Sequence, residues 1–490
     1  MANASIKLSQ AVVDQQHTLA QQNAAFNTSL GGLLKTAASP GNLPDPGQPV
    51  SWALNGSALY VHYTSGAVET YANVVRDDPL ATSGHASATG YTFNQYGAIL
   101  LSGTGTFNFD YTLTGDTLSA TASAQGHRLT GLSVATKLLA GSPGYDPVFG
   151  NVAISLDGNM KLTPAGDVSG TFSNVRVSAD EFLLMSNVDG NFHIDTASAD
   201  AVGGILTAYQ ELYRDGSQMQ FAGLSANVNA HQGLDEALLS DPGLFGGDDD
   251  ISVDLPAHLY DAVMVQAGAG NDHATLKGGG GLLGVMAGDG NDQITLLGGA
   301  HAVDGGAGTD TVRLSMTHAD ATIQRIGTTG STYTVTDKAG TVQQLTGVER
   351  IAFSDTTVAL DIDGNGGQVY RIYQAALNRA PDAGGLGYWI RAMDHGQSLA
   401  SVAQGFLDSA EYHKAYDGVA SNRELVTRYY ENILHRTPDA GGLDFWAGVL
   451  DSKTAGTADV LASISDSAEN KAGLIGVIGN GFEYTPYGQG

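Results

Sequence analysis

Gly268-Ala269-Gly270-Asn271-Asp272 is the first of three similar stretches in this sequence. It returns as Gly288-Asp289-Gly290-Asn291-Asp292 and, more loosely, as Gly305-Gly306-Ala307-Gly308-Thr309-Asp310. In each stretch the second residue after the last aspartate is apolar: Ala274, Ile294 and Val312. The three aspartates are 20 and 18 residues apart, about two nine-residue units each time. This spacing predicts a parallel β-roll, in which short strands wind around a narrow core and alternate between two sheets.

The loops between these strands have the composition of a calcium site. Glycine lets the backbone turn sharply and present its carbonyl groups, and aspartate adds a hard oxygen ligand. Calcium takes about six to eight oxygens, more than one short loop supplies, so an ion must lie between loops stacked on successive turns. The loops at 268, 288 and 306 should stack on one side, and those at 278 and 298, which lack the aspartate, on the other. About two well-formed Ca²⁺ sites are therefore expected. A glycine-rich linker is the alternative, but a linker would not need the apolar residue after each aspartate.

The candidate calcium ligands form three groups. The acidic run Asp248 to Asp250 is either a weak site at the entry of the roll or a plain acidic loop. The run from Asp361 to Gly366 matches the first half of an EF-hand loop, but Ile372 stands where the motif needs glutamate, so only an incomplete calcium loop is possible there. The candidates are Gly268, Gly270, Asp272, Gly288, Asp289, Gly290, Asp292, Asp304, Gly306, Gly308 and Asp310 in the roll, Asp248 and Asp250 before it, and Asp361, Asp363 and Asn365 after it.

The composition favours a β-rich protein that collects divalent cations. A length of 490 residues with 42% hydrophobic content leaves room for several domains. The formal charge of −28 argues against nucleic acid or an anionic membrane surface as a partner. The absence of cysteine excludes disulfides, zinc fingers and thiol nucleophiles. The first 34 residues lack the features of a signal peptide, and no apolar run of about 18 residues predicts a membrane span.

The fold class expected is multidomain and mainly β. Residues 1–49 should form a helix to about residue 36 and a proline-rich linker, and the helix packs either on its own domain or on a neighbouring subunit. Residues 50–240 alternate with period two and predict a β-sandwich or a broad solenoid-like sheet, with turns such as Asp157 to Asn159 and a helical interruption near residues 201–213. Residues 241–360 hold the calcium-binding roll and its capping strands, and residues 361–490 an all-α domain.

The all-α prediction for residues 361–490 rests on an internal repeat. The stretch from Pro381 to Leu386 recurs unchanged from Pro438 to Leu443, at an offset of 57 residues. Each copy is expected to form helix, turn and helix, with the aspartate after the proline placed to cap a helix N-terminus. The arginines and aspartates of these turns are more simply explained as caps and ion pairs than as a binding site.

The loops resemble the repeats-in-toxin family of type I secreted proteins. The paired helical unit, with its Arg-x-Pro-Asp-x-x-Gly and following Trp, resembles a domain of unassigned function that is often found C-terminal to such repeats in secreted and surface-layer proteins. The resemblance implies a secreted or cell-surface protein that a type I secretion machinery exports in one step and that folds in extracellular calcium. It also implies an uncleaved export signal in the segment from Gly473 to Gly490.

The sequence predicts a structural protein and not an enzyme. It contains no H-E-x-x-H and no G-x-S-x-G, and its 13 histidines have no ligand spacing. The outward strand positions are rich in Ser, Thr, Asn and Gly, which suits either burial against other copies of the chain or an ordinary sandwich with little surface charge. We expect a surface-layer, biofilm-matrix or filament subunit, or adhesin, that self-assembles as a homo-oligomer with calcium, with cell-surface polysaccharide as a candidate partner. The alternatives are a monomeric carbohydrate- or host-binding module and, with less support, a secreted hydrolase.

Overall fold

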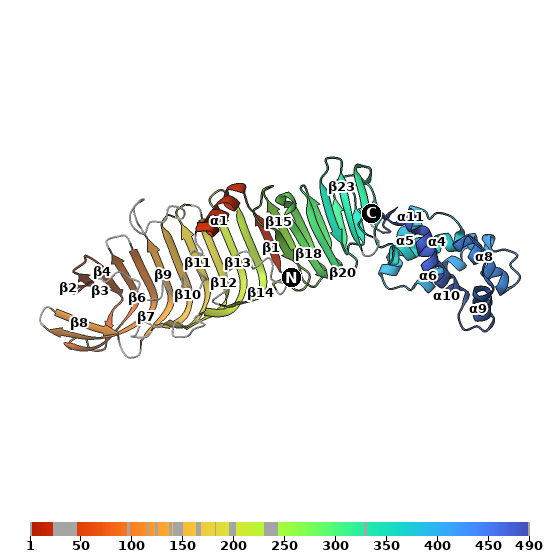
Figure 1. Cartoon of the computed structure of the whole chain (residues 1–490). Helices are drawn as coiled ribbons and strands as arrows, with labels where there is room; N and C mark the ends of the chain where they lie inside the picture. Colours follow the sequence, from red (N-terminus) through yellow and green to blue (C-terminus); the bar gives the residue numbers. More distant parts are fainter. Residues whose placement is uncertain are drawn as a thin grey trace. The chain divides into compact units, whose positions relative to one another are not determined.

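The chain divides into two compact units, Met1–Gly268 and Ala269–Gly490. Strands dominate the first unit, whereas the second has strands followed by helices (Figure 1). The predicted mainly β, multidomain fold class is therefore confirmed. The computed structural model describes residues 2–22, 47–95, 99–114, 117–122, 126–136, 140, 150–162, 168–181, 183–195, 202–229, 244–327 and 331–488.

Antiparallel strands that follow one another in the chain form most of the first unit, so of the two predicted arrangements the broad sheet is found. β1 (Asn3–Lys7) lies between β14, to which it is antiparallel, and β15 (Asp250–Leu255), to which it is parallel. The unit ends with β16 (Val263–Gln266). The other strands are β2 (Pro49–Asn55), β3 (Ala58–Tyr63), β4 (Val68–Ala72), β5 (Val75–Arg76), β6 (Ser83–Gln95), β7 (Ile99–Thr114), β8 (Thr117–Ala122), β9 (His127–Thr136), β10 (Val152–Leu162), β11 (Val168–Ala179), β12 (Leu183–Asp195), β13 (Val202–Tyr213) and β14 (Gln218–Asn229).

The long strands of this sheet bend near their middles. Register shifts occur in the neighbouring pairs from β6–β7 to β13–β14. A bulge of this kind inserts an extra residue and turns the strand. Glycine is required at such a bend: a Cβ on Gly105, whose φ is +141°, would lie 2.0 Å from the carbonyl oxygen of Arg128. The turn predicted from Asp157 to Asn159 is wrong, because these residues form a bulge inside β10.

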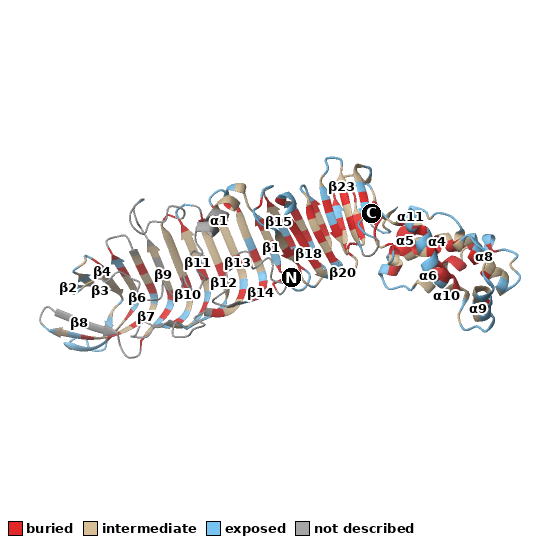
Figure 2. Cartoon of the chain, viewed as in Figure 1, coloured by how far each residue is buried: buried red, intermediate tan, exposed pale blue. Residues whose placement is uncertain are grey.

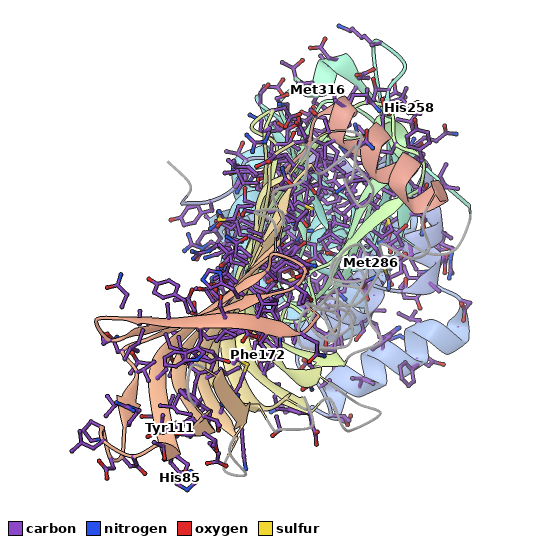
Figure 3. All side chains as sticks on the ribbon, turned by 90° about the vertical axis from the view of Figure 1, so that its left-hand side faces the viewer. His85, Tyr111, Phe172, His258, Met286 and Met316 are labelled. Carbon is purple, nitrogen blue, oxygen red and sulfur yellow. The ribbon has the colours of Figure 1, made fainter. Side chains whose placement is uncertain are left out.

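Apolar side chains form rows across the strands on the inner side of the bend. Beyond the bulges Phe172 stacks on Phe192, with ring centroids 4.9 Å apart. Tyr91 and Phe107, which lie on opposite sides of the bend, have centroids 5.7 Å apart. Figure 3 labels Phe172 of β11 and Tyr111 of β7. From β9 to β14, one row paired in register from strand to strand is Leu132, Leu156, Val175, Val188, Tyr209 and Phe221.

Two further sequence predictions for the first unit are wrong. The first residues form strand β1, and helix α1 (Gln10–Gln22) begins only after it. Residues 202–213, expected to include a helix, form β13, because pairing with β12 and β14 on both sides outweighs local helix propensity. Helix α1 packs through Val12 against a cluster of its own unit that includes Leu183 and Tyr213. The rest of the predicted helix and the proline-rich linker at 40–46 lie outside the described residues.

The second unit begins with the predicted parallel roll, which is confirmed. One sheet runs β17–β19–β21–β25 with parallel pairs, and antiparallel β26 and β27 extend it. The other sheet runs β18–β20–β24 in parallel, extended by the hairpin β22–β23. The strands are β17 (His273–Gly278), β18 (Leu283–Asp289), β19 (Gln293–Leu297), β20 (His301–Ala307), β21 (Thr311–Leu314), β22 (Ala321–Arg325), β23 (Thr332–Asp337), β24 (Val342–Thr346), β25 (Arg350–Ala352), β26 (Thr357–Ala359) and β27 (Phe482–Tyr484).

Alternation along the roll strands places aliphatic side chains inside. Figure 2 shows buried and exposed residues alternating along these strands. The inner residues are Ala274, Ile294, Val312 and Ile351 in one sheet and Val285, Val303 and Leu345 in the other, and all are buried.

The predicted helical repeat is confirmed, but each copy has four helices where two were expected, and strand β27 makes residues 361–490 not purely α. Asp382 caps α5 by accepting a hydrogen bond from the Gly385 N–H at 2.7 Å, and Asp439 caps α9 through the Gly442 N–H at 2.9 Å. The first four helices are α4 (Asn365–Leu377), α5 (Ala383–Asp394), α6 (Leu399–Leu407) and α7 (Ala410–Ala415), and the second four are α8 (Asn422–Leu434), α9 (Ala440–Asp451), α10 (Thr457–Ser465) and α11 (Ala468–Ile478). Both sets share one hydrophobic core.

Replacing Asp382 by alanine should destabilise the helical repeats by about 1 kcal/mol, because the first turn of α5 loses its only side-chain cap. Chemical denaturation followed by tryptophan fluorescence would measure this loss. Asp382→Asn is the control, since asparagine caps about as well as aspartate. An equal loss in both variants would show that charge, and not capping, is what matters.

Candidate metal centre

Three buried aspartates form a ladder along one edge of the roll. Asp272, Asp292 and Asp310 have relative exposures of 1%, 1% and 0%. The Oδ1 atom of Asp292 accepts a hydrogen bond from the Asp272 N–H at 2.8 Å, and Oδ1 of Asp310 accepts from the Asp292 N–H at 2.9 Å. The ladder continues to Glu349, whose Oε2 accepts from the Asp310 N–H at 2.9 Å. Successive turns are therefore joined by one acid each.

In two aspartates of this ladder the second carboxylate oxygen has no hydrogen-bond partner. Oδ2 of Asp292 and Oδ2 of Asp310 are buried and have no hydrogen-bond partner in the structure. A buried, unpartnered carboxylate oxygen is costly unless a cation compensates it. Burial raises the pKa of Asp292, and burial with repulsion from Glu349 raises the pKa of Asp310 to about 8. Both groups therefore occupy an environment that disfavours a bare negative charge.

Asparagine side chains also hydrogen-bond successive loops, and each accepts from the loop that follows it. Oδ1 of Asn271 accepts a hydrogen bond from the Asn291 N–H at 2.9 Å. Oδ1 of Asn291 then accepts from the Thr309 N–H at 2.8 Å. Since the aspartates accept from the preceding loop and the asparagines from the following one, the two ladders fix the spacing of the loops.

Glycines let the backbones of successive loops approach each other closely. Gly290 and Gly308 have φ values of +145° and +139°. A Cβ on Gly290 would lie 1.6 Å from the Gly270 carbonyl oxygen, and one on Gly308 would lie 1.7 Å from the Gly290 carbonyl oxygen. Only glycine fits at both positions.

The donor set fits calcium. It consists of hard oxygens, from carboxylates and backbone carbonyls, and it has no nitrogen or sulfur ligands. Within the described ranges no three Asp, Glu or His side chains gather around one point. With one acid per turn, an ion here would take most of its ligands from the backbone carbonyls of two stacked loops. We infer that Asp272, Asp292 and Asp310 would hold such ions.

The remaining roll candidates lie around this ladder. Asp289 is exposed, and Asp304 is half-buried on β20. Gly268, Gly288 and Gly306 have φ values of +95°, +106° and +90°, and therefore serve the turns of their loops. Whether Asp289 or Asp304 binds calcium stays a prediction.

In the acidic run before β15 the middle residue is the buried one. Asp249 is 2% exposed, and its Oδ1 accepts a hydrogen bond from the backbone N–H of Ala2. The two candidates, Asp248 and Asp250, are exposed. Asp249 precedes the buried Ile251 by two residues, as Asp272 precedes Ala274. The sequence rule thus points to Asp249 in this run and not to its neighbours.

The half EF-hand loop has other partners. Asp361 forms a buried ion pair with Arg350 and accepts a hydrogen bond from the Gly366 N–H at 2.8 Å. Asp363 lies 3.7 Å from an Arg325 guanidinium nitrogen, and Asn365 donates to Asp394 at 2.9 Å. The three side chains are directed to different partners, and we do not propose a calcium site there.

Glu349 belongs to the same ladder but is not among the candidates taken from the sequence. The signal for it was present: Gly347 precedes it by two residues, and the buried Ile351 follows it by two. The hairpin β22–β23 separates Glu349 from Asp310 by 39 residues and hides the repeat.

Comparisons with known proteins support one part of the resemblance. A family model described as a domain of unknown function (DUF4214) matches residues 365–416 and 403–474, which are the helical repeats. The crystal structure of the extracellular lipase LipA from Serratia marcescens is similar over 24% of this chain and 16% of the lipase, with 13% identity and a TM-score of 0.16. No curated protein matches the sequence. The likeness of the loops to the repeats-in-toxin family stays a prediction.

In the part of the chain that the structure describes, no helix combines the length and apolar character needed to cross a bilayer.

Proposed function

We propose that this chain is an extracellular structural protein whose roll folds around Ca²⁺. The observation that supports this best is the pair of buried, unpartnered oxygens on Asp292 and Asp310. Bound calcium would supply the positive charge that these carboxylates lack. Because the ion binds only the folded roll, it would stabilise the folded state by mass action.

The proposal includes export before folding. At a formal charge of −28 the chain repels itself where calcium is scarce, which suits passage through a type I secretion machinery. Outside the cell calcium would then drive folding of the roll. The protein would act there as a surface-layer, biofilm-matrix or filament subunit, or as an adhesin.

One face of the first unit's sheet supports assembly or adhesion. A row of residues crosses eleven strands in register, none of them is buried, and Arg176 is the only charged one. Hydroxyl and amide groups, about 4.8 Å apart from strand to strand, can donate and accept hydrogen bonds without adding charge to this face. The row is Thr70, Thr92, Ser102, Ser133, Ser155, Arg176, Asn187, Gln210, Gln220, Ser5 and Ser252.

Two occupants suit such a face: the same face of another copy, and a neutral polysaccharide of the cell surface. The first gives the self-assembling homo-oligomer, which we favour. The second gives a monomeric carbohydrate-binding module as the alternative function.

Light scattering and electron microscopy should show sheets or filaments with millimolar calcium and monomers with chelator. Magnesium at the same concentration is the control, because it prefers stricter octahedral geometry and keeps its waters. Monomers under every condition would contradict self-assembly, and binding of those monomers to cell-wall glycans would favour the alternative. Turnover of ester, peptide or glycan substrates would contradict a purely structural role.

A further inference from the structure

We propose that calcium at the last turn of the roll fixes the helical repeats in place, through the adjacent residues Glu349 and Arg350. This coupling rests on the proposed function, since it requires that the roll binds calcium. It also makes docking depend on calcium, because the first helical repeat would be fully docked only when the roll has bound Ca²⁺.

Glu349 is where the acid ladder of the roll ends. Its carboxylate holds the Asp310 N–H, and its carbonyl oxygen accepts the Leu360 N–H at 2.8 Å. Strand β25 begins at the next residue and pairs in parallel with β21. An ion beside the buried Oδ2 of Asp310 would therefore fix the start of β25, because the Asp310 carbonyl oxygen accepts the Arg350 N–H at 3.0 Å from the next turn.

Arg350 connects the start of β25 to the helical repeats and to β27. It is the first residue of β25, directly after Glu349, and its Nη1 donates to the Glu349 carbonyl oxygen at 2.8 Å. Its side chain is buried, with only 3% of the residue exposed. It pairs with Asp361 before α4 and with Asp394 at the end of α5, where Nη2 lies 3.2 Å from Oδ2. The guanidinium also lies 5.9 Å from the ring centroid of Tyr484 in β27.

These partners are themselves joined to the helices and to the C-terminal strand. Asp361 accepts from the Gly366 N–H in the first turn of α4. Asn365 donates to Asp394 at 2.9 Å, which links the start of α4 to the end of α5. Tyr484 pairs with Thr357 of β26. One arginine of the roll thus contacts the segment before α4, the end of α5 and the last strand.

The second helical repeat provides an internal comparison. Asn422 donates to Asp451 at 2.7 Å, which repeats the Asn365–Asp394 bond 57 residues later. Asp451 is exposed, and among the described residues no salt bridge reaches it. The Asn–Asp bond therefore belongs to the repeat itself, whereas the bond from Arg350 is an addition in the first copy. The ion pair from Arg350 is thus specific to the first repeat, as expected for a contact that docks this repeat on the roll.

Without the ion, the acids of the last turn repel one another and β25 is held less firmly. Arg350 would then lose its fixed position between Asp361 and Asp394. By linkage, calcium that stabilises this turn also stabilises the docked helices, and docked helices raise the calcium affinity of the turn.

Tryptophan fluorescence can follow the helices alone. The chain has three tryptophans, of which Trp389 and Trp446 lie in the helical repeats. In a Trp52→Phe background, urea unfolding of the full chain should show a higher midpoint with millimolar calcium than with chelator. Asp394→Asn keeps an oxygen for Asn365 but removes the charge that faces Arg350, and it should reduce this calcium-dependent rise by at least half. The matched control Asp451→Asn should leave the rise unchanged.

Calcium titration by far-UV circular dichroism, run on the same variants, distinguishes calcium-dependent folding of the roll from its coupling to the helices. Asp394→Asn should still fold its roll with calcium. If it also retains the full fluorescence rise, or if the background protein shows no rise while its roll folds, the coupling is overturned and the calcium roll stands. If no variant responds to calcium by either method, the proposed function itself fails. Arg350→Gln is less informative, because it leaves two buried carboxylates unpaired and lowers stability in both conditions.

Discussion

Replacing Asp292 by asparagine should raise the calcium concentration needed to fold the roll by roughly tenfold or more. Asparagine keeps an Oδ1 that can accept the Asp272 N–H, so the hydrogen-bond ladder survives. What is lost is the charge on the central carboxylate, which faces the loops on both sides. A calcium titration followed by far-UV circular dichroism measures the midpoint.

Asp261→Asn is the control for this experiment, because Asp261 is an exposed aspartate outside the roll. Its midpoint should equal that of the unmodified protein. Asp249 is a poor control, since it is buried and holds Ala2. Equal midpoints for Asp292→Asn and Asp261→Asn would show that the ladder is not the calcium site.

Replacing Gly290 by alanine should prevent the loops from stacking. Its φ of +145° is strained for any residue with a side chain, at a cost of about 1–3 kcal/mol. The added Cβ would also lie 1.6 Å from the Gly270 carbonyl oxygen, so the two loops must separate. We expect the roll to remain unfolded at calcium concentrations that fold the unmodified protein.

Gly298→Ala separates the two causes of that loss. Gly298 also has a positive φ, of +65°, but a Cβ there meets nothing within 4 Å. It should cost about 1–2 kcal/mol from backbone strain alone. Thermal unfolding in saturating calcium would compare the two variants. If Gly298→Ala is as damaging as Gly290→Ala, strain explains both, and close contact between the loops is not needed.

Short repeats allowed the roll to be predicted from sequence. An aspartate followed two residues later by an aliphatic residue determines which side chain enters the core, and the spacing of 20 and 18 residues determines which loops stack. Asp272, Asp292 and Asp310 lie where this rule puts them. If the rule also requires a glycine two residues before the acid, and allows glutamate and unequal spacing, it selects Asp249 and Glu349 as well.

Contacts between residues far apart in the sequence explain the two failed predictions of local structure, and they also give Asp361 a partner that the sequence does not reveal. Nothing local to Asp361 indicates that Arg350 occupies its carboxylate. The Gly158 region has turn composition, but its pairing with two neighbouring strands makes it a bulge. The segment 202–213 has residues that suit a helix, yet it lies between two partner strands. In each case a tertiary contact decides between local structures of similar energy.

The position of β1 constrains how the first unit can fold. This strand comes first in the chain, but its partners β14 and β15 follow more than 200 residues later. Contacts of such high sequence separation form slowly, because the loop-closure entropy must be overcome before the strand pairs. Until β1 arrives, the facing backbone groups of β14 and β15 are open edges on which another chain could add a strand. Insertion of β1 between β14 and β15 is therefore a late folding step. Whether a chain inserts its own β1 or the β1 of another copy would decide between a monomer and a strand-exchanged assembly.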